Sequence, residues 1–415
     1  MQQGVYRDTW AWNLGFSAYW FAVSYKWFIL LFVLLPLQVR EFVPEGSHNS
    51  AWGAVYGIGA VWAIVGPVLF GAWSDRADSR WGHRRPFILV GALLTLVALG
   101  VLVSAPSLMV FAVGYLLLQV ADDVGTGPYG GMVPELVPVA SRGRASAAMV
   151  LLQRLAEVAS AIAAIILVAN GRIYAGIAVV TLAGAALTLW TLRGHRRHTP
   201  PPKDRPGLAQ VWIEPWKSAD FRWVWANRAL TALAFALVTN YLVNYLTDEF
   251  ASFRIFDYDA KTPAGAANVL AVTVAMFGAA GALLAGRLAD RIGRKHVIYL
   301  SAVLVLGALG PLALTRDLTL IWLLALPFGV GFGLYSSADW ALASDVIPHL
   351  DRAGSQMGLW TSSLTSVQLV VGAAGFLVDS LNQVRPGAGY TAMFWISGAL
   401  FLVGTVLIRL VRGSR

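Results

Sequence analysis

The stretch GAWSDRADSRWGHRRPFILVG, residues 71–91, places four arginines, one histidine and two aspartates between two long apolar runs. Apolar runs of about 20 residues cross a lipid bilayer as helices, because the bilayer core is about 30 Å thick. A short basic segment between two such runs is typical of a loop on the cytoplasmic side, where Lys and Arg accumulate. We therefore predict a membrane-spanning helix on each side of this stretch.

The composition of the whole chain extends this prediction. Of its 415 residues, 57% are hydrophobic and 13% are charged, and the mean hydropathy is +0.64, whereas soluble domains carry about 25% charged residues. Lipid cannot satisfy the edge of an open sheet, so we predict an all-α membrane protein. The chain has no cysteine, which excludes disulfides, iron–sulfur clusters and thiolate chemistry.

The apolar runs predict twelve transmembrane helices, at 12–37, 51–73, 86–104, 108–138, 145–168, 173–192, 220–246, 265–288, 296–314, 319–345, 354–378 and 390–411. The even-numbered joins carry most of the basic residues: Arg76, Arg80, Arg84, Arg85, Arg142, Arg144, Arg193, Arg196, Arg197, Lys203, Arg205, Arg287, Arg291, Arg294, Lys295 and Arg352. The odd-numbered joins hold only Arg40, Arg172, Arg254, Lys261, Arg316 and Arg385. This asymmetry predicts a multi-pass protein of the cell inner membrane with both termini in the cytoplasm. It also accounts for the net charge of +9 without a nucleic-acid partner.

Several classes of protein are disfavoured by what the sequence lacks. The N-terminal residues MQQGVYRDTWAWNLG do not have the parts of a cleaved signal peptide, so we expect the first apolar run to be a retained helix. No P-loop, zinc-protease or G-x-S-x-G motif occurs, and the six histidines fall in loops or at helix ends. We therefore expect no enzyme, no metal site and no cofactor. A proton is the expected coupling ion, with sodium as the alternative.

The chain divides into two similar halves. We predict an N-terminal six-helix bundle over 1–192, a cytoplasmic linker over 193–219 that contains RGHRRHTPPPKDRPG, and a C-terminal six-helix bundle over 220–415. GAWSDR (71–76) recurs as GRLADR (286–291), and PELVP (134–138) recurs as SDVIP (344–348). Parallel repeats of this kind build transporters with the substrate site between the halves.

The repeated basic loops have two interpretations. They can simply fix the topology. Alternatively, an aspartate just after a helix accepts hydrogen bonds from arginine and from a neighbouring helix N-terminus, and such a cluster forms a cytoplasmic gate when it breaks in one conformation. The predicted gate joins one cluster to a partner cluster. The first cluster is Asp75, Arg76, Arg84 and Arg85, and the second is Asp290, Arg291 and Arg294.

These motifs resemble the major facilitator superfamily over essentially the whole chain. GPVLFGAWSDRADSRWGHRRPFI (66–88) more closely resembles the sugar:cation symporter branch, which includes the plant sucrose transporters and their animal relatives. That branch favours Ser-Arg-Trp-Gly-Arg-Arg-Arg-Pro-Phe, and His83 replaces one arginine here. The run LQVADDVGTGPYGGMVPEL (118–136) resembles the corresponding sucrose-transporter helix at Val120, Ala121, Gly127, Pro128 and Leu136. The resemblance implies two six-helix bundles that alternate access to a central site.

Two departures from the family pattern limit what the resemblance implies. The proton-linked aspartate of the sucrose transporters falls on Gln119, and their substrate-linked arginine falls on Gly130. Melibiose-type relatives carry acidic cation ligands in their second helix, whereas AWGAVYGIGAVWAIVGP (51–67) has no acidic residue. The architecture therefore carries over, but sucrose as the substrate and sodium coupling through the second helix do not.

Charged residues inside the predicted helices are candidates for coupling, because an ionisable group in a bilayer costs about 2.5–3.5 kcal/mol on insertion scales. Asp122 and Asp123 lie about 22 Å along the fourth helix at 1.5 Å per residue. We predict that one of them, with Asp123 favoured, takes up and releases a proton, and that Arg154 holds the deprotonated form. Glu157 is a second acceptor for Arg154. The alternative is a static salt bridge that orients the fourth and fifth helices.

Three further charges have open assignments. Lys26 lies in the middle of the first helix, where it binds an anionic substrate group or pairs with the aspartates. Arg228 either lines the cavity or anchors the seventh helix at the cytoplasmic face. Asp339 lies toward the inner end of the tenth helix, where a gating pair and a substrate contact are both open.

Sugar binding needs hydrogen-bonding groups and a flat aromatic face. The candidates are Asn13, Tyr19, Tyr25, Gln119, Gln153, Asn240, Tyr241, Asn244, Trp340, Trp360 and Gln368. Tyr241 and Asn244, and likewise Asn240 and Asn244, share a helix face. The alternative for the aromatic residues is helix packing or an interfacial belt.

The sequence therefore predicts a secondary active transporter, working as a monomer, that carries a sugar or glycoside together with a proton. A proton-coupled exporter of drugs or metabolites is the main alternative, because it would use the same fold and the same aspartates. A lipid translocase and a transporter-like sensor are further alternatives.

Overall fold

The computed structural model describes residues 6–43, 48–169, 172–193 and 207–412. The first part of the chain contains α1 (Trp10–Ile29), a π-helical turn η1 (Leu30–Leu34), α2 (Leu35–Phe42), α3 (His48–Arg76), α4 (Arg85–Val103), α5 (Leu108–Gly130), α6 (Met132–Leu136), η2 (Val139–Ser141), α7 (Arg142–Ala169) and α8 (Ile173–Thr191). The second part contains α9 (Leu208–Ile213), η3 (Glu214–Lys217), α10 (Ala219–Glu249), α11 (Pro263–Ile292), α12 (Arg294–Leu312), α13 (Leu318–Val346), η4 (Leu350–Arg352), α14 (Ala353–Ser366), α15 (Gln368–Val384), α16 (Ala388–Leu407) and η5 (Ile408–Leu410). The predicted all-α membrane fold is therefore present.

Within the described residues, ten helices are long and apolar enough to cross a membrane. The other two predicted spans correspond to interrupted helical segments. The first runs through α1, η1 and α2, where Pro36 lacks the N–H that a regular α-helix needs and the backbone widens to a π-helical turn. The other runs through α14 and α15, which are separated at Val367. The predicted twelve-helix arrangement is consistent with these elements.

The chain forms two compact units. The first comprises Met1–Lys217 with Ile347–Ser362, and the second comprises Ser218–Val346 with Ser363–Arg415. The division at Lys217 lies close to the predicted end of the linker at 219. Residues 347–362 differ from the prediction, because they group with the first unit and not with the C-terminal bundle. The described part of the linker also differs, since residues 208–217 fold into α9 and η3.

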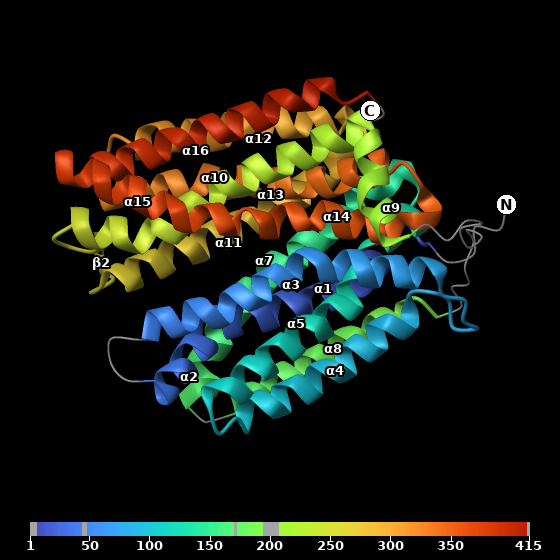
Figure 1. Cartoon of the computed structure of the whole chain (residues 1–415). Coiled ribbons are helices and arrows are strands. Elements are labelled where there is room, and N and C mark those ends of the chain that lie inside the picture. The colour runs from blue at the N-terminus through green and yellow to red at the C-terminus, as the bar shows by residue number, and fades with distance from the viewer. Residues whose placement is uncertain (1–5, 44–47, 170–171, 194–206, 413–415) are drawn as a thin grey trace. The chain divides into compact units, whose positions relative to one another are not determined.

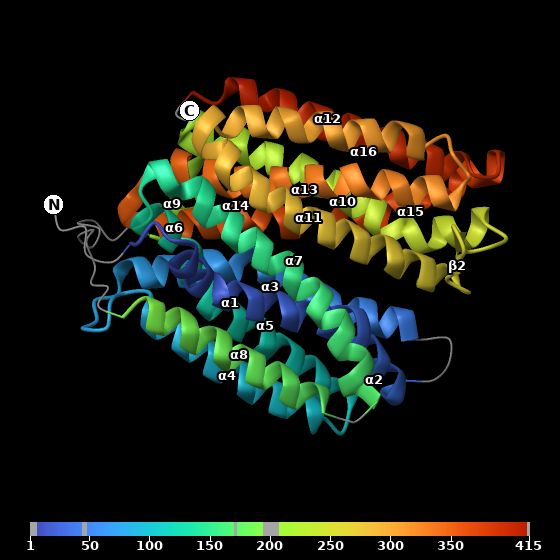
Figure 2. The same cartoon turned by 180° about the vertical axis from the view of Figure 1, so that it is seen from behind.

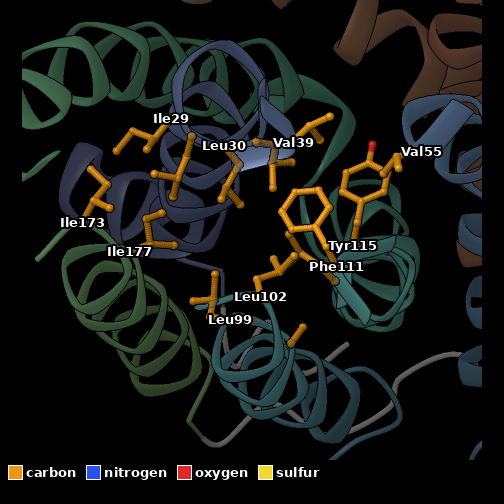
Figure 3. Close-up of a cluster of buried hydrophobic side chains, with 14 of the residues drawn as sticks. Ile29, Leu30, Val39, Val55, Leu99, Leu102, Phe111, Tyr115, Ile173 and Ile177 are labelled. Carbon is orange, nitrogen blue, oxygen red and sulfur yellow. The ribbon is translucent and has the colours of Figure 1, made fainter. Parts of the chain in front are cut away.

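In the first unit, α1 packs against α7 and α8, while α5 packs against α3 and α4 (Figures 1 and 2). A buried hydrophobic cluster fills one end of this bundle, where the end of α4 meets the start of α5 and of α8 (Figure 3). Its labelled members are Ile29, Leu30, Val39, Val55, Leu99, Leu102, Phe111, Tyr115, Ile173 and Ile177. This cluster holds α1 in the position from which it presents Lys26 to α5.

In the second unit, α13 packs against α11 and α12, and α10 packs against α16 (Figure 1). A short hairpin of β1 (Arg254–Ile255) and β2 (Tyr258–Asp259) lies between α10 and α11, with Ile255 paired to Tyr258. The sequence analysis did not predict this hairpin.

The repeated loops adopt the same backbone turn in both units. Gly82 and Gly293 each have φ +88°, a region that favours glycine. Each lies just before a helix that begins with basic residues, α4 and α12. The sequence repeat is therefore also a structural repeat at these loops.

Candidate functional site

A buried ion pair joins the first and fourth long helices of the first unit. Lys26 of α1 donates to Asp122 Oδ1 of α5, and the two residues are 2% and 6% exposed. Lys26 Nζ also lies 5.2 Å from the ring centroid of Trp27. Of the two interpretations of Lys26, the structure contains the pairing with an aspartate.

Asp123 has different surroundings from its neighbour. It is 3% exposed and lies beside Asp122, Lys26, Gln119 and Trp62. Asp123 Oδ2 and Trp62 Nε1 both lack a hydrogen-bond partner among the described residues. A buried polar atom of this kind is normally satisfied by a proton, a water molecule or a ligand. The geometry thus places a buried carboxyl group beside a fixed ion pair, with Gln119 and Trp62 as polar neighbours and one oxygen that accepts no well-aligned hydrogen bond from the described residues.

Arg154 makes an ion pair on its own helix. Its Nη1 atom donates to both carboxylate oxygens of Glu157, at 2.7 and 2.9 Å. The two residues are one turn apart on α7 and therefore share a face, whereas Lys26 occupies the position beside Asp122. Glu157 is therefore an acceptor for Arg154, and a role of Arg154 in holding the deprotonated aspartate stays a prediction.

The second unit contains a corresponding pair. Arg228 of α10 donates to Asp339 Oδ2 of α13, and the guanidinium carbon lies 5.9 Å from the ring centroid of Trp340. Asp339 is 0% exposed and Arg228 is 6% exposed. Arg228 is therefore a buried partner of Asp339 and does not extend to the surface as an anchor.

A third ionic cluster lies at the loop quoted first in the sequence analysis. Arg84 binds Asp75 at 2.7 Å, Ser74 at 2.5 Å and also Glu135. Burial alone would lower the pKa of Arg84, but the carboxylates of Glu135 and Asp75 raise it above its usual value. Arg84 therefore stays charged. His83 Nε2 lies 3.2 Å from Glu135.

Asp75 connects this cluster to residues 347–362 of the same unit. Its two carboxylate oxygens accept hydrogen bonds from the backbone N–H groups of Gly354, at 3.0 Å, and Ser355, at 2.9 Å. These groups lie at the start of α14, where unpaired backbone N–H groups favour an anion. The interaction explains why this segment groups with the first unit.

The partner cluster of the predicted gate is arranged differently. Arg294 pairs with Asp345 at 3.1 Å, inside the second unit, while Asp290 and Arg291 are exposed. In the first cluster Arg76 and Arg85 are half-buried, and Arg84 makes the ion pairs described above.

Glu135 and Asp345 are functional candidates that the sequence analysis missed. They stand at matching positions of the PELVP and SDVIP repeats, separated by the same interval as Arg84 and Arg294. The repeat therefore contained the signal for both ion pairs.

The candidates for sugar binding separate into packed and exposed residues. Tyr25 belongs to the hydrophobic cluster, Tyr19 and Trp360 are buried, and the Tyr241 hydroxyl donates to Val371 O at 2.8 Å. Asn13 is buried and bonds to Thr9 O, and Gln119 is 8% exposed beside Asp123. Asn240 and Asn244 are exposed on α10, and Gln153 is half-buried. Gln368 begins α15, and its side chain lies outside the described residues.

Comparison with protein families gives a match over most of the chain. The model of the Major Facilitator Superfamily matches residues 15–372. This region contains both buried ion pairs and both repeated loops.

Curated proteins match over shorter stretches. Sucrose transport protein SUC3 of Arabidopsis thaliana is 25% identical over 153 residues, covering 31% of this chain and 25% of that protein. Proton-associated sugar transporter A of Mus musculus is 31% identical over 94 residues, covering 22% of this chain and 12% of that protein. The chain thus spans about a quarter or less of the length of these relatives.

Solved structures match over nearly the whole chain. A crystal structure of FucP in the outward conformation, a fucose:proton symporter of E. coli, has a TM-score of 0.73 and 13% identity, covering 97% of this chain and 98% of that chain. At this identity the likeness concerns the fold alone.

Proposed function

Because the chain belongs to the Major Facilitator Superfamily and is a multi-pass membrane transporter, we propose that it carries a sugar or glycoside into the cell together with a proton. The single observation that carries the proposal is the setting of Asp123, a buried carboxyl group beside the Lys26–Asp122 ion pair whose Oδ2 atom has no hydrogen-bond partner among the described residues. Ionisable groups at such depth belong to ion pathways by default, because they are costly in lipid.

The proposed cycle uses Asp123 as the proton carrier. A proton from the outer solution binds the Asp123 carboxylate and removes its negative charge from beside Asp122. After the transporter has changed conformation and the site is open to the cytoplasm, the same proton leaves to that side. Lys26 stays bound to Asp122 throughout the cycle. Asp122 and Asp123 therefore have separate roles. Arg154 and Glu157 form a neighbouring pair on α7 that orients this helix.

The names of the matched relatives support a sugar as the substrate. In this chain, Asn240 and Asn244 support it as well, because they are exposed within a predominantly apolar helix. Amides are costly in contact with lipid, so we propose that this face of α10 contacts an aqueous path and hydrogen bonds to sugar hydroxyls. Gln153 and Gln119 are the proposed donors from the first unit.

The proposed location is the cell inner membrane, with both termini in the cytoplasm. The distribution of basic residues between even and odd joins supports this orientation. In that orientation the Asp75–Arg84 cluster lies on the cytoplasmic side, where we propose that it acts as a gate.

Uptake into proteoliposomes tests the proposed function. Purified protein is reconstituted and supplied with labelled mono- and disaccharides, with and without an inward proton gradient. We expect at least one sugar to accumulate only when the gradient is present, and a protonophore to abolish the accumulation. Liposomes without protein serve as the control for leakage.

Two results would contradict the proposal. Accumulation that follows a sodium gradient and ignores the proton gradient would exclude proton coupling. Loss of a preloaded compound driven by an inward proton gradient, with no sugar uptake, would identify an exporter instead. The exporter remains the second candidate because Gly130 replaces the substrate-linked arginine of the sucrose transporters.

A further inference from the structure

Each unit places one buried ion pair between its first and fourth long helices. In the first unit these helices are α1 and α5, with Lys26 and Asp122. In the second unit they are α10 and α13, with Arg228 and Asp339. The proposed function uses the carboxylates of the first unit only. The corresponding pair in the second unit therefore needs its own explanation.

The position of the second pair argues against a surface anchor. Arg228 lies nine residues after Ala219, or about 14 Å along α10, and Asp339 lies seven residues before Val346, or about 10 Å along α13. Both side chains are buried, and the guanidinium also lies near the face of Trp340. Placing two charges at this depth carries a large desolvation cost, which a simple helix contact between apolar residues would avoid.

The hydrogen bonding of the pair is incomplete. Arg228 binds Asp339 Oδ2, while Asp339 Oδ1 has no hydrogen-bond partner within the described ranges. Nearby, Tyr335 donates to Asn227 Oδ1 at 2.9 Å, and Asn227 Nδ2 is likewise unmatched among the described residues. Such buried atoms are ordinarily satisfied by water or by an added proton.

The surroundings of Asp339 contain few charges. Arg228 faces it from α10, and Tyr335 lies one turn away on α13 itself. From α16, Phe401 packs on Tyr335 with ring centroids 5.6 Å apart. Gly404 of α16 packs closely on α10 beside Asn227, because a methyl group there would lie 3.1 Å from Thr231 Oγ1 and 3.2 Å from Asn227 O. A polar strip thus reaches from Asn227 through Tyr335 to Asp339.

We propose that Asp339 is a second proton-binding site, held ionised by Arg228 and protonated on its free oxygen when that ion pair opens. The step adds one proton from solution to the Asp339 carboxylate and frees the Arg228 guanidinium from its ion pair, and the reverse step returns the proton to solution and restores the pair. This inference rests on the proposed function for its role in coupling. It extends that function to one titratable carboxylate in each half.

Infrared titration of the purified protein tests the site without any substrate. Spectra are recorded from about pH 4 to 9, and the absorbance of protonated carboxyl groups is followed in the wild type, Asp339→Asn and Asp257→Asn. Asp257 is an exposed aspartate of the hairpin and provides the matched control. We expect Asp339→Asn to lack one titrating band of a buried carboxyl group that Asp257→Asn retains. The same buried-carboxyl bands in Asp339→Asn and in the wild type would overturn the proposal.

The Arg228→Lys variant covers the case in which Asp339→Asn does not fold, because it keeps a cation beside the acid. If Asp339 binds a proton, the Arg228→Lys variant keeps the Asp339 band, but the pH at which the band reaches half its height changes. If the salt bridge is permanently ionised, neither the wild type nor the variant shows an Asp339 band. The proton-to-sugar ratio in proteoliposomes then assigns the role. We expect the Asp339→Asn substitution to lower the number of protons moved per sugar by about half. A wild type that titrates at Asp339 but moves no proton with sugar would contradict the proposed function and leave the site in place.

Discussion

At the scale of single residues, Asp122 and Asp123 are adjacent in sequence but point toward different helices. Neighbouring residues on a helix are about 100° apart, so Asp122 meets Lys26 of α1 while Asp123 faces Gly66 and Trp62 of α3. Asp122 is paired with a cation, whereas Asp123 Oδ2 has no hydrogen-bond partner in the part of the chain that the structure describes. This difference is the physical basis for assigning the proton to Asp123.

The space at Gly66 provides a test of that assignment. A methyl group at Gly66 would lie 2.2 Å from Asp123 Oδ2 and 2.8 Å from Trp62 Nε1. We expect Gly66→Ala to displace the carboxyl group and to reduce proton-driven uptake by about tenfold or more. Gly57→Ala on the same helix is the control, because nothing lies within 4 Å of its added methyl. Equal uptake by the two variants would argue against a role for Asp123.

The Lys26–Asp122 pair makes a prediction about stability. Replacing Lys26 by Met leaves Asp122 buried without its cation, which we expect to destabilise the protein by about 3–5 kcal/mol. The double variant Lys26→Met, Asp122→Asn removes both charges and should recover most of that loss. Thermal unfolding in detergent measures both effects. If the double variant is no more stable than the single one, the ion pair is not what the substitution disrupts.

The sequence shows which ionisable residues lie inside transmembrane helices, but it does not show all of their ion-pair partners. Asp122, Asp123, Lys26, Arg228 and Asp339 stand out because each interrupts an apolar run. Pairing depends on how α1, α5 and α7 rotate about their axes, and the sequence alone does not contain that rotation. The sequence leaves the pairing of Lys26 with Asp122 open for this reason, whereas Arg154 and Glu157 lie one turn apart on one helix and their pairing follows from the spacing.

At the scale of helices, close contacts depend on glycine. A methyl group at Gly333 of α13 would lie 1.9 Å from Gly278 O of α11, so the two backbones would have to separate. We expect Gly333→Ala to destabilise the second unit by about 1–3 kcal/mol. Gly307→Ala on α12 meets nothing within 4 Å and is the control. A melting temperature that falls equally in both variants would mean that helix propensity, and not the contact, is responsible.

The interaction between Asp75 and the start of α14 predicts a change in accessibility. Asp75→Ala removes two charge-assisted hydrogen bonds, each worth about 1.5–3 kcal/mol. Since about 1.4 kcal/mol corresponds to a tenfold change, the labelling of a single cysteine at Ser355 by a maleimide should rise at least about tenfold. The native chain has no cysteine, so no background needs to be removed.

Asp78→Ala is the matched control for this experiment, because it removes an exposed aspartate from the same loop. Labelling of the cysteine at position 355 should not change in that background. Unchanged labelling in Asp75→Ala would show that Asp75 does not hold the start of α14.

Long apolar runs predicted most helices, but the shorter elements leave no such pattern in the sequence. The β1–β2 hairpin has only two residues in each strand, too few for an alternating pattern. The π-helical turn before α2 and the separation of α14 from α15 are local backbone changes inside apolar runs. Helix α9 has six residues, and it lies inside the predicted linker, whose assignment rests on the Pro-rich sequence that precedes the helix.

At the scale of the whole molecule, the two units repeat the same ionic plan. Arg84 with Glu135 in one unit corresponds to Arg294 with Asp345 in the other, and the glycines that precede these arginines share a φ of +88°. The buried pairs repeat as well, each between the first and fourth long helices. The duplication was visible in the sequence at the loops, where charged motifs are distinctive, but not inside the apolar helices.

The central claim is that Asp123 carries the proton that drives sugar accumulation. The most direct measurement compares net uptake with exchange in proteoliposomes that contain the Asp123→Asn variant. Asparagine keeps the size of the side chain but cannot bind and release a proton at physiological pH. The account predicts that gradient-driven accumulation falls at least about severalfold, to the level that the proposed second site alone can drive, while exchange of labelled for unlabelled sugar continues near the wild-type rate. Accumulation at the wild-type level in Asp123→Asn would contradict it.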